Sequence, residues 1–356
     1  AADGAGSGLD ADTVDSMHAN QLIEAASDEV RTPISSTSDP IDQPGSYYLT
    51  QNLSGSTQGI DITANNVTLD LMGFTIDGGG SVNDYGISFH GYDNVTIKNG
   101  TVKGFAYNGI YQGLSTAKYG RVIDVKALEN GLFGIRVVGS NSLILRCTAG
   151  ENGAYGIYAG VGSVVKENTA YKNQGLSGIA TGSGSTLTQN TVYQHQSDNG
   201  IYAGTASTLI NNTVQDTQGL HGIYALNGAI LINNVAFQNK GWGIYATYSN
   251  VLRGNMAYSN NQSQTADQGG IRRGDDSQAI NNTADSNYHT AIYLDGDNTV
   301  LRDNHATDSL VVSTVSQCFY FSSADNAAIG NTATECTIEF AGLLPPISRF
   351  RDNIEW

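Results

Sequence analysis

Proline is nearly absent from the body of this sequence. Five prolines occur in 356 residues, and none of them lies between Pro44 and Pro345. Proline has no amide hydrogen to donate to a β-ladder, so it is excluded from strands that are paired on both sides. A proline-free stretch of this length favours backbone that is hydrogen-bonded to neighbouring strands throughout.

Charge is also scarce, and positive charge is scarcest. Only 14% of the residues are charged, and 17 basic residues face 33 acidic ones, which gives a net charge of −16. Such a surface repels nucleic acid and anionic membranes, so we expect neither as a partner. No apolar run approaches the roughly eighteen residues of a membrane span. The sequence starts Ala-Ala-Asp, typical of a chain whose signal peptide has been removed, so we expect a secreted or cell-surface protein.

One phrase is repeated along the chain. The stretch "GIYAGTASTLINNTV" at 200–214 returns in closely similar form at 156–170, 178–192 and 222–236. Its Gly-Ile pair recurs from 59–60 to 270–271, mostly in steps of 21 to 23 residues. The Gly-Ile pair and a second repeated residue recur with the same spacing, which indicates a solenoid in which each repeat packs on the next. The second repeated residue is an asparagine: Asn168, Asn190, Asn212, Asn234, Asn255, Asn282, Asn304, Asn331 and Asn353.

Between these positions, apolar and polar residues alternate with the period of two that is typical of strands. The alternation predicts that Ile201 and Ala203 point inward and Tyr202 outward. Glycine and serine between the strands supply turns. Each repeat then forms one coil of about three short strands that pair with the same strands of the next coil. The sequence predicts an all-β parallel β-helix solenoid of about 13 coils with a repeat of about 22 residues.

The asparagine series has a physical reason in this fold. An inward asparagine at a tight turn can bond through its amide to the same asparagine in the coils above and below. This satisfies turn backbone that would otherwise be buried without partners. Cys147 takes the position in "RCTA", so we expect the ladder to be imperfect near its start.

Residues 44–356 resemble the right-handed parallel β-helix proteins of the pectate-lyase-like superfamily. They are most similar to the "GI…NNTI…N" repeats of exported bacterial β-helix proteins. The phrase "GLDADTVDSMHA" at 8–19 resembles segments of phage tail fibres and secreted bacterial proteins. The resemblance implies a right-handed solenoid. It implies no single activity, since this fold hosts lyases, hydrolases, epimerases, adhesins and structural fibres.

The two ends suggest a first function. Residues 1–43 are expected to form an arm and a capping helix, with the helix over 10–30. The asparagine series runs to Asn353, close to the last residue of the sequence. An uncovered parallel edge is a template for another chain. We therefore expect an extracellular structural protein, a rod that assembles head-to-tail with its own copies into a fibre or surface layer.

The alternative is a polysaccharide-active enzyme or glycan-binding protein that uses the outward face around residues 267–303. Outward aromatic residues could stack on sugar rings. They could equally stabilise neighbouring coils or contact another subunit, and both interpretations stay open. The aromatic residues at this position of the repeat include Tyr158, Tyr202, Tyr224, Tyr245 and Tyr293.

Candidate catalytic residues lie where the coils lengthen, beside "NNQSQTADQ" at 260–268 and "DSLVVSTVS" at 308–316. Arg272, His289 and Tyr293 could serve a lyase or epimerase as carboxylate neutraliser, base and acid. Asp275 and Asp295 could serve a hydrolase as paired carboxylates. The alternative is that these are solvated turn charges. No catalytic phrase of the lyase or epimerase families occurs, so we expect no enzyme, with a polysaccharide lyase or glycoside hydrolase as the alternative.

The cysteines and histidines of this sequence indicate a disulfide but no metal site. The register places Cys318 almost above Cys336 in the next coil, within disulfide reach, as an exported protein would allow. Cys147 is expected to be a buried free thiol. The six histidines have no metal-ligand spacing, so we expect no metal and no cofactor, although loop aspartates could hold Ca²⁺.

Overall fold

The computed structural model describes residues 30–54, 59–82, 85–263, 268–307, 317–336, 338–342, 350–351 and 353–355. These residues contain strands and turns and no helix. The arm and helix expected within residues 1–43 lie outside them up to residue 29. Most of the two lengthened corners at 260–268 and 308–316 also lies outside them.

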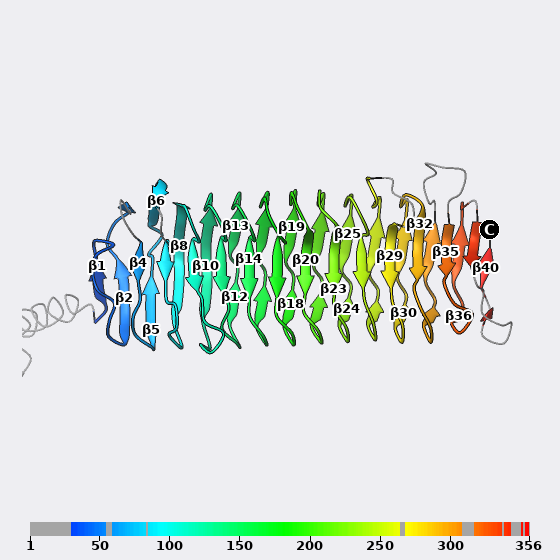
Figure 1. The fold of residues 1–356 in the computed structure, drawn as a ribbon, viewed down its shortest axis with the longest axis horizontal. Helices are drawn as coiled ribbons and strands as arrows, with labels where there is room; N and C mark the ends of the chain where they lie inside the picture. Colours follow the sequence, from blue (N-terminus) through cyan, green and yellow to red (C-terminus); the bar gives the residue numbers. More distant parts are fainter. Residues whose placement is uncertain are drawn as a thin grey trace, which may run out of the picture.

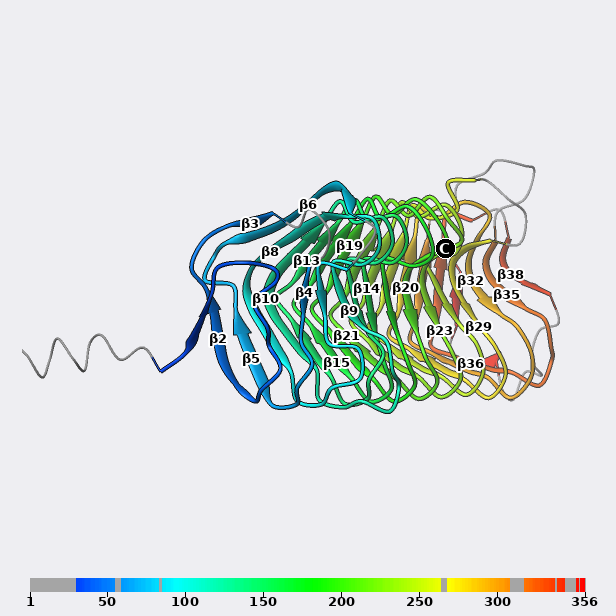
Figure 2. The ribbon, with the colours of Figure 1, turned by 60° about the vertical axis from the view of Figure 1, so that its left-hand side comes forward.

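Parallel strands stack into a long rod (Figure 1). Each coil contributes one strand to a 13-stranded sheet, here called the first face. Figure 2 shows the coils as loops stacked along the rod. The predicted all-β parallel solenoid is confirmed. The strands of the first face are β4 (Ile60–Asp61), β7 (Ile87–Ser88), β9 (Ile110–Gln112), β11 (Ile135–Val137), β14 (Ile157–Ala159), β17 (Ile179–Thr181), β20 (Asn199–Ala203), β23 (His221–Ala225), β26 (Ile244–Ala246), β29 (Gly269–Arg273), β32 (Thr290–Leu294), β35 (Gln317–Phe321) and β38 (Ile338–Gly342).

A 27-stranded sheet forms the rest of the wall and bends once per coil, which divides it into a second and a third face. The second face contains β1 (Thr32–Ile34), β2 (Gly45–Leu49), β5 (Val67–Asp70), β12 (Leu143–Leu145), β15 (Val164–Lys166), β18 (Thr186–Thr188), β21 (Thr208–Ile210), β24 (Ile230–Ile232), β27 (Val251–Arg253), β30 (Gln278–Ile280), β33 (Val300–Arg302), β36 (Ala327–Ile329) and β39 (Phe350–Arg351). The third face contains β3 (Leu53–Ser54), β6 (Thr75–Val82), β13 (Thr148–Gly150), β16 (Thr169–Tyr171), β19 (Thr191–Tyr193), β22 (Thr213–Gln215), β25 (Val235–Phe237), β28 (Met256–Tyr258), β31 (Thr283–Asp285), β34 (His305–Thr307), β37 (Thr332–Thr334) and β40 (Ile354–Glu355). The longer strands β8 (Thr96–Phe105) and β10 (Arg121–Leu128) run through both faces.

The core follows the alternation of the repeat. Ile201 and Ala203 on β20 are fully buried, and Tyr202 between them is half-buried on the outside. Leu209 and Val214 close the interior from the second and third faces. Every coil buries the same few apolar side chains against the next, so the core is a continuous column along the rod.

The asparagine ladder lies at the bend between the second and third faces. The backbone amide and the Nδ2 atom of Asn190 donate to Oδ1 of Asn212, at 3.0 and 2.9 Å. Nδ2 also donates to the carbonyl of Val165, at 2.8 Å. The residue before each ladder asparagine from Asn168 to Asn331 turns the chain with positive φ, as Asn211 does at 55°. Each side chain thus satisfies a backbone amide and a carbonyl of the preceding coil and bonds to the asparagine side chain of the next coil, as Asn212 does with Asn190, Leu187 and Asn234.

A second ladder occupies the bend between the third face and the first face. In it, Asn152 Nδ2 donates to Asn173 Oδ1 at 2.9 Å, and Asn239 Nδ2 donates to Asn260 Oδ1 at 2.9 Å. The sequence analysis missed this series, although each member follows the corresponding position of the first ladder by five residues. Its members are Asn130, Asn152, Asn173, Asn239, Asn260 and Asn287. Two intervening coils place His195 and Thr217 at this position instead.

Two further features mark the ends of the described stack. Strand β1 pairs in parallel with β2, and Ile34 is buried, so the coils start upstream of the boundary expected at residue 44. Near the other end, a disulfide joins Cys318 and Cys336 across neighbouring coils, with 5.7 Å between their Cα atoms. Cys147 is a buried free thiol whose pKa is raised to about 12 by burial.

Candidate functional site

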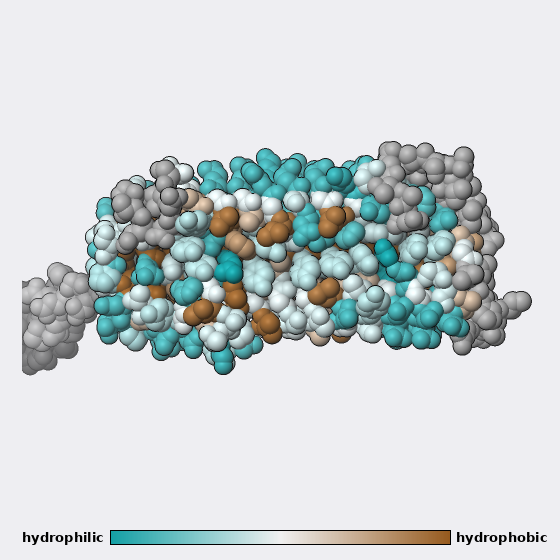
Figure 3. Space-filling view, in the orientation of Figure 1, coloured by the Kyte–Doolittle hydropathy of each residue, from teal (hydrophilic) through white to brown (hydrophobic). Residues whose placement is uncertain are grey.

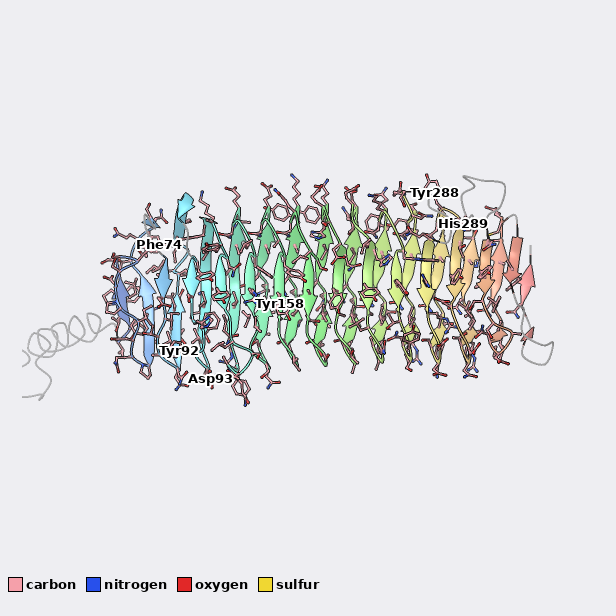
Figure 4. All side chains as sticks on the ribbon, in the orientation of Figure 1. Phe74, Tyr92, Asp93, Tyr158, Tyr288 and His289 are labelled. Atoms are coloured by element: carbon pink, nitrogen blue, oxygen red, sulfur yellow. A yellow bond between two sulfur atoms is a disulfide. The ribbon has the colours of Figure 1, made fainter. Side chains whose placement is uncertain are left out.

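Outward side chains stack along the first face into what we call the tyrosine row. It consists of Tyr158, Tyr202, Tyr224, Tyr245, Arg272, Tyr293 and Tyr320. Register places one member on each strand, and Ala180 replaces a tyrosine between Tyr158 and Tyr202. Figure 4 shows Tyr158 midway between the two margins of the rod.

Rings of neighbouring coils are in contact along this row. The ring centroids of Tyr224 and Tyr245 lie 5.2 Å apart, and those of Tyr293 and Tyr320 lie 4.7 Å apart. In Figure 3 the middle of the visible face is pale with brown patches, while its margins are hydrophilic. The row therefore combines aromatic surface with polar tips, which suits ligands that have both apolar and hydroxylated faces.

Arg272 interrupts the tyrosines and lies between two of them. Its guanidinium is 4.7 Å from the ring centroid of Tyr245 and 5.5 Å from that of Tyr293, within the range of cation–π attraction. It also forms an ion pair with Asp295. Burial lowers the pKa of Arg272, but the hydrogen bond to Asp295 and the neighbouring tyrosines outweigh this, so the pKa is raised. Arg272 is thus a fixed cation on this face.

Two residues beside Arg272 complete the cluster. The His221 ring lies 5.1 Å from that of Tyr245, and burial, together with the charge of Arg272, lowers the pKa of His221 to about 4. Trp242 is buried, meets the edge of Tyr293 at 5.9 Å, and donates its backbone amide to Nδ1 of His221 at 3.3 Å. His221 is therefore neutral near pH 7. The sequence analysis missed both, although each stands directly before a Gly-Ile pair.

The other predicted residues lie apart from this cluster. Oδ1 of Asp275 accepts from the backbone amide of Asp297 at 2.8 Å, so Asp275 holds a turn. His289 stands before the start of β32, where Nδ1 is 3.0 Å from Thr290 Oγ1. It is four residues from Tyr293, roughly 13 Å along an extended strand. Figure 4 shows His289 at the margin of the rod.

The structure thus brings Arg272, Tyr293 and Asp295 together, whereas the printed contacts of Asp275 and His289 are to Asp297 and Thr290. The neutraliser and the acid of the lyase hypothesis, Arg272 and Tyr293, are in contact, but the base His289 stands before β32 and does not join them. Within the described residues, no three His, Cys, Asp or Glu side chains lie where they could share a metal ion. The same part of the chain contains no helix that could cross a membrane.

Arg273, the next residue, points into the core. Its side chain is fully buried, and its three guanidinium nitrogens have no hydrogen-bond partner among the described residues. Burial lowers the pKa of Arg273 to about 9. On the second face of the same coil the inward residue is Ala279, which is smaller than Leu252 and Leu301 in register on either side of it. Arg273 is a buried structural residue and not part of the outward cluster.

A family model for the right-handed β-helix region matches residues 52–202 and 199–343. The chain belongs to this family. No curated protein sequence is significantly similar to this β-helix protein. The resemblance to right-handed parallel β-helix proteins that the repeat predicted is confirmed.

Two solved structures are similar in fold. The Azotobacter vinelandii mannuronan C-5 epimerase AlgE4 A-module is 16% identical with a TM-score of 0.53, over 92% of this chain and 94% of that one. The Dettilon tailspike protein is 13% identical with a TM-score of 0.50, over 87% of this chain and 62% of that one. At these identities the likeness shows the fold alone.

Proposed function

We propose that this β-helix is an extracellular protein that binds a polysaccharide along the tyrosine row, with the sugar chain running parallel to the rod. The observation that carries the proposal is the position of Arg272, held between the rings of Tyr245 and Tyr293 and paired with Asp295. A charged side chain clamped in this way is a fixed hydrogen-bonding group on an otherwise aromatic surface.

The chemistry of the row fits sugar rings. Tyrosine rings offer flat apolar surface to the C–H faces of a sugar, and their hydroxyl groups bond to its hydroxyls. Nε of Arg272 is a buried donor without a partner among the described residues. Asp295 is 41% exposed in its side chain and adds acceptor capacity beside it. Successive members recur at the strand spacing of about 4.8 Å, so one long chain can contact many coils.

Similarity of fold supports the same class of ligand. One structurally similar protein is named as an epimerase of mannuronan, a polysaccharide, and another is a tailspike protein. The local geometry supports binding rather than turnover, because the candidate base His289 lies at the far end of its strand and Arg272 already neutralises Asp295. Head-to-tail assembly into a fibre or surface layer stays a prediction.

Affinity electrophoresis in gels containing neutral or uronate polysaccharides tests this proposal. Arg272→Ala and Tyr245→Ala should each weaken retardation by the bound polysaccharide about tenfold, because each removes a part of the clamp. Tyr258→Ala is the matched control, since Tyr258 stacks on Phe237 at 4.7 Å on the third face. Retardation that is unchanged in both row variants would refute the proposal.

A further inference from the structure

Two adjoining hollows lie on the bend between the third face and the first face, in the middle of the rod. One has a volume of about 910 Å³ and the other about 610 Å³, and both are lined by Gln196 and Gln218. We call them together the corner groove. Its remaining amide lining comes from Gln174 and Gln194, and Leu176 and Leu220 form its apolar wall. It lies on a different surface from Arg272.

The second asparagine ladder is broken directly beneath this groove. His195 and Thr217 occupy the ladder position in the two coils from which Gln196 and Gln218 project. Nε2 of His195 contacts the carbonyl of Leu176, which lines the groove. Asn173 above and Asn239 below are ladder asparagines, so the interruption spans two coils only.

Buried polar atoms without partners gather at this break. Nδ1 of His195 and Oγ1 of Thr217 have no hydrogen-bond partner among the described residues, although both side chains are fully buried. Ser177 Oγ, just before β17, and Asn199 Oδ1, at the start of β20, also have no hydrogen-bond partner among the described residues. Elsewhere on this bend the asparagine ladder satisfies such groups. An unpaired buried polar group costs free energy, so the two coils beside the groove give up stability that the ladder supplies to the other coils.

The lining indicates which ligand fits. Four glutamine side chains each offer a donor and an acceptor, which matches hydroxyl groups better than charges. The lining contains three carboxylates, Glu151, Asp198 and Asp216, and two cations, Lys172 and Lys240, so the groove does not attract an anion. The exposed Leu176 and Leu220 offer apolar surface to the face of a sugar ring.

We propose that the corner groove is a second binding site, for a segment of neutral oligosaccharide. The choice of a saccharide rests on the proposed function, whereas the position of the site rests on the groove and on the ladder break. The groove would hold sugars through amide hydrogen bonds and leave the acidic residues at its rim. Selectivity for neutral sugars distinguishes it from the tyrosine row, where Arg272 supplies a cation.

The first test measures the affinity of fluorescently labelled hexasaccharides of glucose, mannose, galactose and xylose, with a mannuronate hexamer for comparison. Gln196→Ala combined with Gln218→Ala should weaken binding of a neutral hexasaccharide at least tenfold. Gln278→Ala, at an exposed glutamine of the second face, is the matched control. Gel retardation by uronate polysaccharide, which reports on the tyrosine row, is measured in parallel, so failure of the tyrosine row and failure of the groove are told apart.

Two results would overturn the proposal: equal affinity in the double glutamine variant, or no binding of any neutral hexasaccharide by the unaltered protein. A second variant tests the floor of the groove. His195→Asn combined with Thr217→Asn should continue the ladder from Asn173 to Asn239, raise the melting temperature and weaken hexasaccharide binding. A stabilised variant that binds as tightly as before would show that the ladder break is no part of a site.

Discussion

Arg272 and Arg273 are neighbours in sequence with opposite environments. Arg272 projects from the first face and is compensated by Asp295. Arg273 enters the apolar column, where no described carboxylate meets it. A buried guanidinium without partners destabilises a fold, because its lost hydration is not replaced.

Replacing Arg273 with methionine should therefore stabilise the protein. Methionine fills a similar unbranched volume without the charge. We expect the free energy of unfolding to rise by about 1–4 kcal/mol in urea titrations. Arg253→Met, at an exposed arginine of β27, is the control and should change stability little. A loss of stability on Arg273→Met would show that a partner for this cation exists.

His221 should make stability depend on pH. Its pKa is about 4 in the folded protein, below its ordinary value of 6.5, because burial and Arg272 both disfavour the charged form. Below pH 6.5 the unfolded chain binds a proton that the folded protein refuses, so the free energy of unfolding falls as pH drops from 6.5 to 4.

At pH 5 the loss attributable to His221 is about 2 kcal/mol. His221→Gln should remove this part of the pH dependence, which urea titrations of both proteins at pH 7 and pH 5 would reveal. Equal losses in the two proteins would contradict the burial of His221 beside Arg272.

At the scale of elements, the ladders hold the bends that the strands cannot stabilise themselves. Asn212 receives two hydrogen bonds from Asn190 and donates to the carbonyl of Leu187 and to Asn234. All of these groups are buried, so no water replaces the lost partner. One asparagine therefore stabilises three consecutive coils.

Asn212→Ala should lower the free energy of unfolding by about 2–5 kcal/mol, because several buried groups lose their partner at once. Gln215→Ala, whose outward side chain lies on the neighbouring strand β22, should cost about 0.5 kcal/mol or less. Urea titration compares the two. Similar costs would mean that the ladder does not carry the stability assigned to it.

Most of the fold could be predicted from the sequence because two recurring features indicate the same positions in most coils. Gly-Ile marks the first face, and Asn212 with its equivalents marks one bend. The second ladder was missed because His195 and Thr217 interrupt it. In addition, its asparagines follow strands of varied sequence. The same alternation that placed Ala203 inward also places Arg273 inward, so its burial had a signal in the sequence.

The candidate site was less predictable. Register alone placed Arg272 beside Tyr293, since equivalent positions of neighbouring coils always meet in a parallel solenoid. The pairing with Asp295 depends on how the chain leaves β32, and the approach of Trp242 to Tyr293 depends on side-chain direction. His289 was grouped with them because it is close in sequence, but a strand carries it to the other margin.

At the scale of the whole molecule, the rod presents different chemistry on different surfaces. The first face has a row of aromatic side chains that includes the cation Arg272, and the bend beside it has an amide-lined groove. A net charge of −16 lets the surface resist polyanions in general, so specific contacts must decide what binds. A stacked solenoid suits a long ligand because equivalent groups recur along its axis.

The central claim, that a polysaccharide binds on the tyrosine row, has a built-in reporter. The sequence contains two tryptophans, and Trp242 packs against Tyr293 within the Arg272 cluster. Trp356→Phe leaves Trp242 as the single tryptophan, so its fluorescence can be followed while polysaccharide is added. We predict a saturable change in Trp242 emission that Arg272→Ala abolishes. Binding of the same polysaccharide, measured by calorimetry, without any change in this emission would contradict the account.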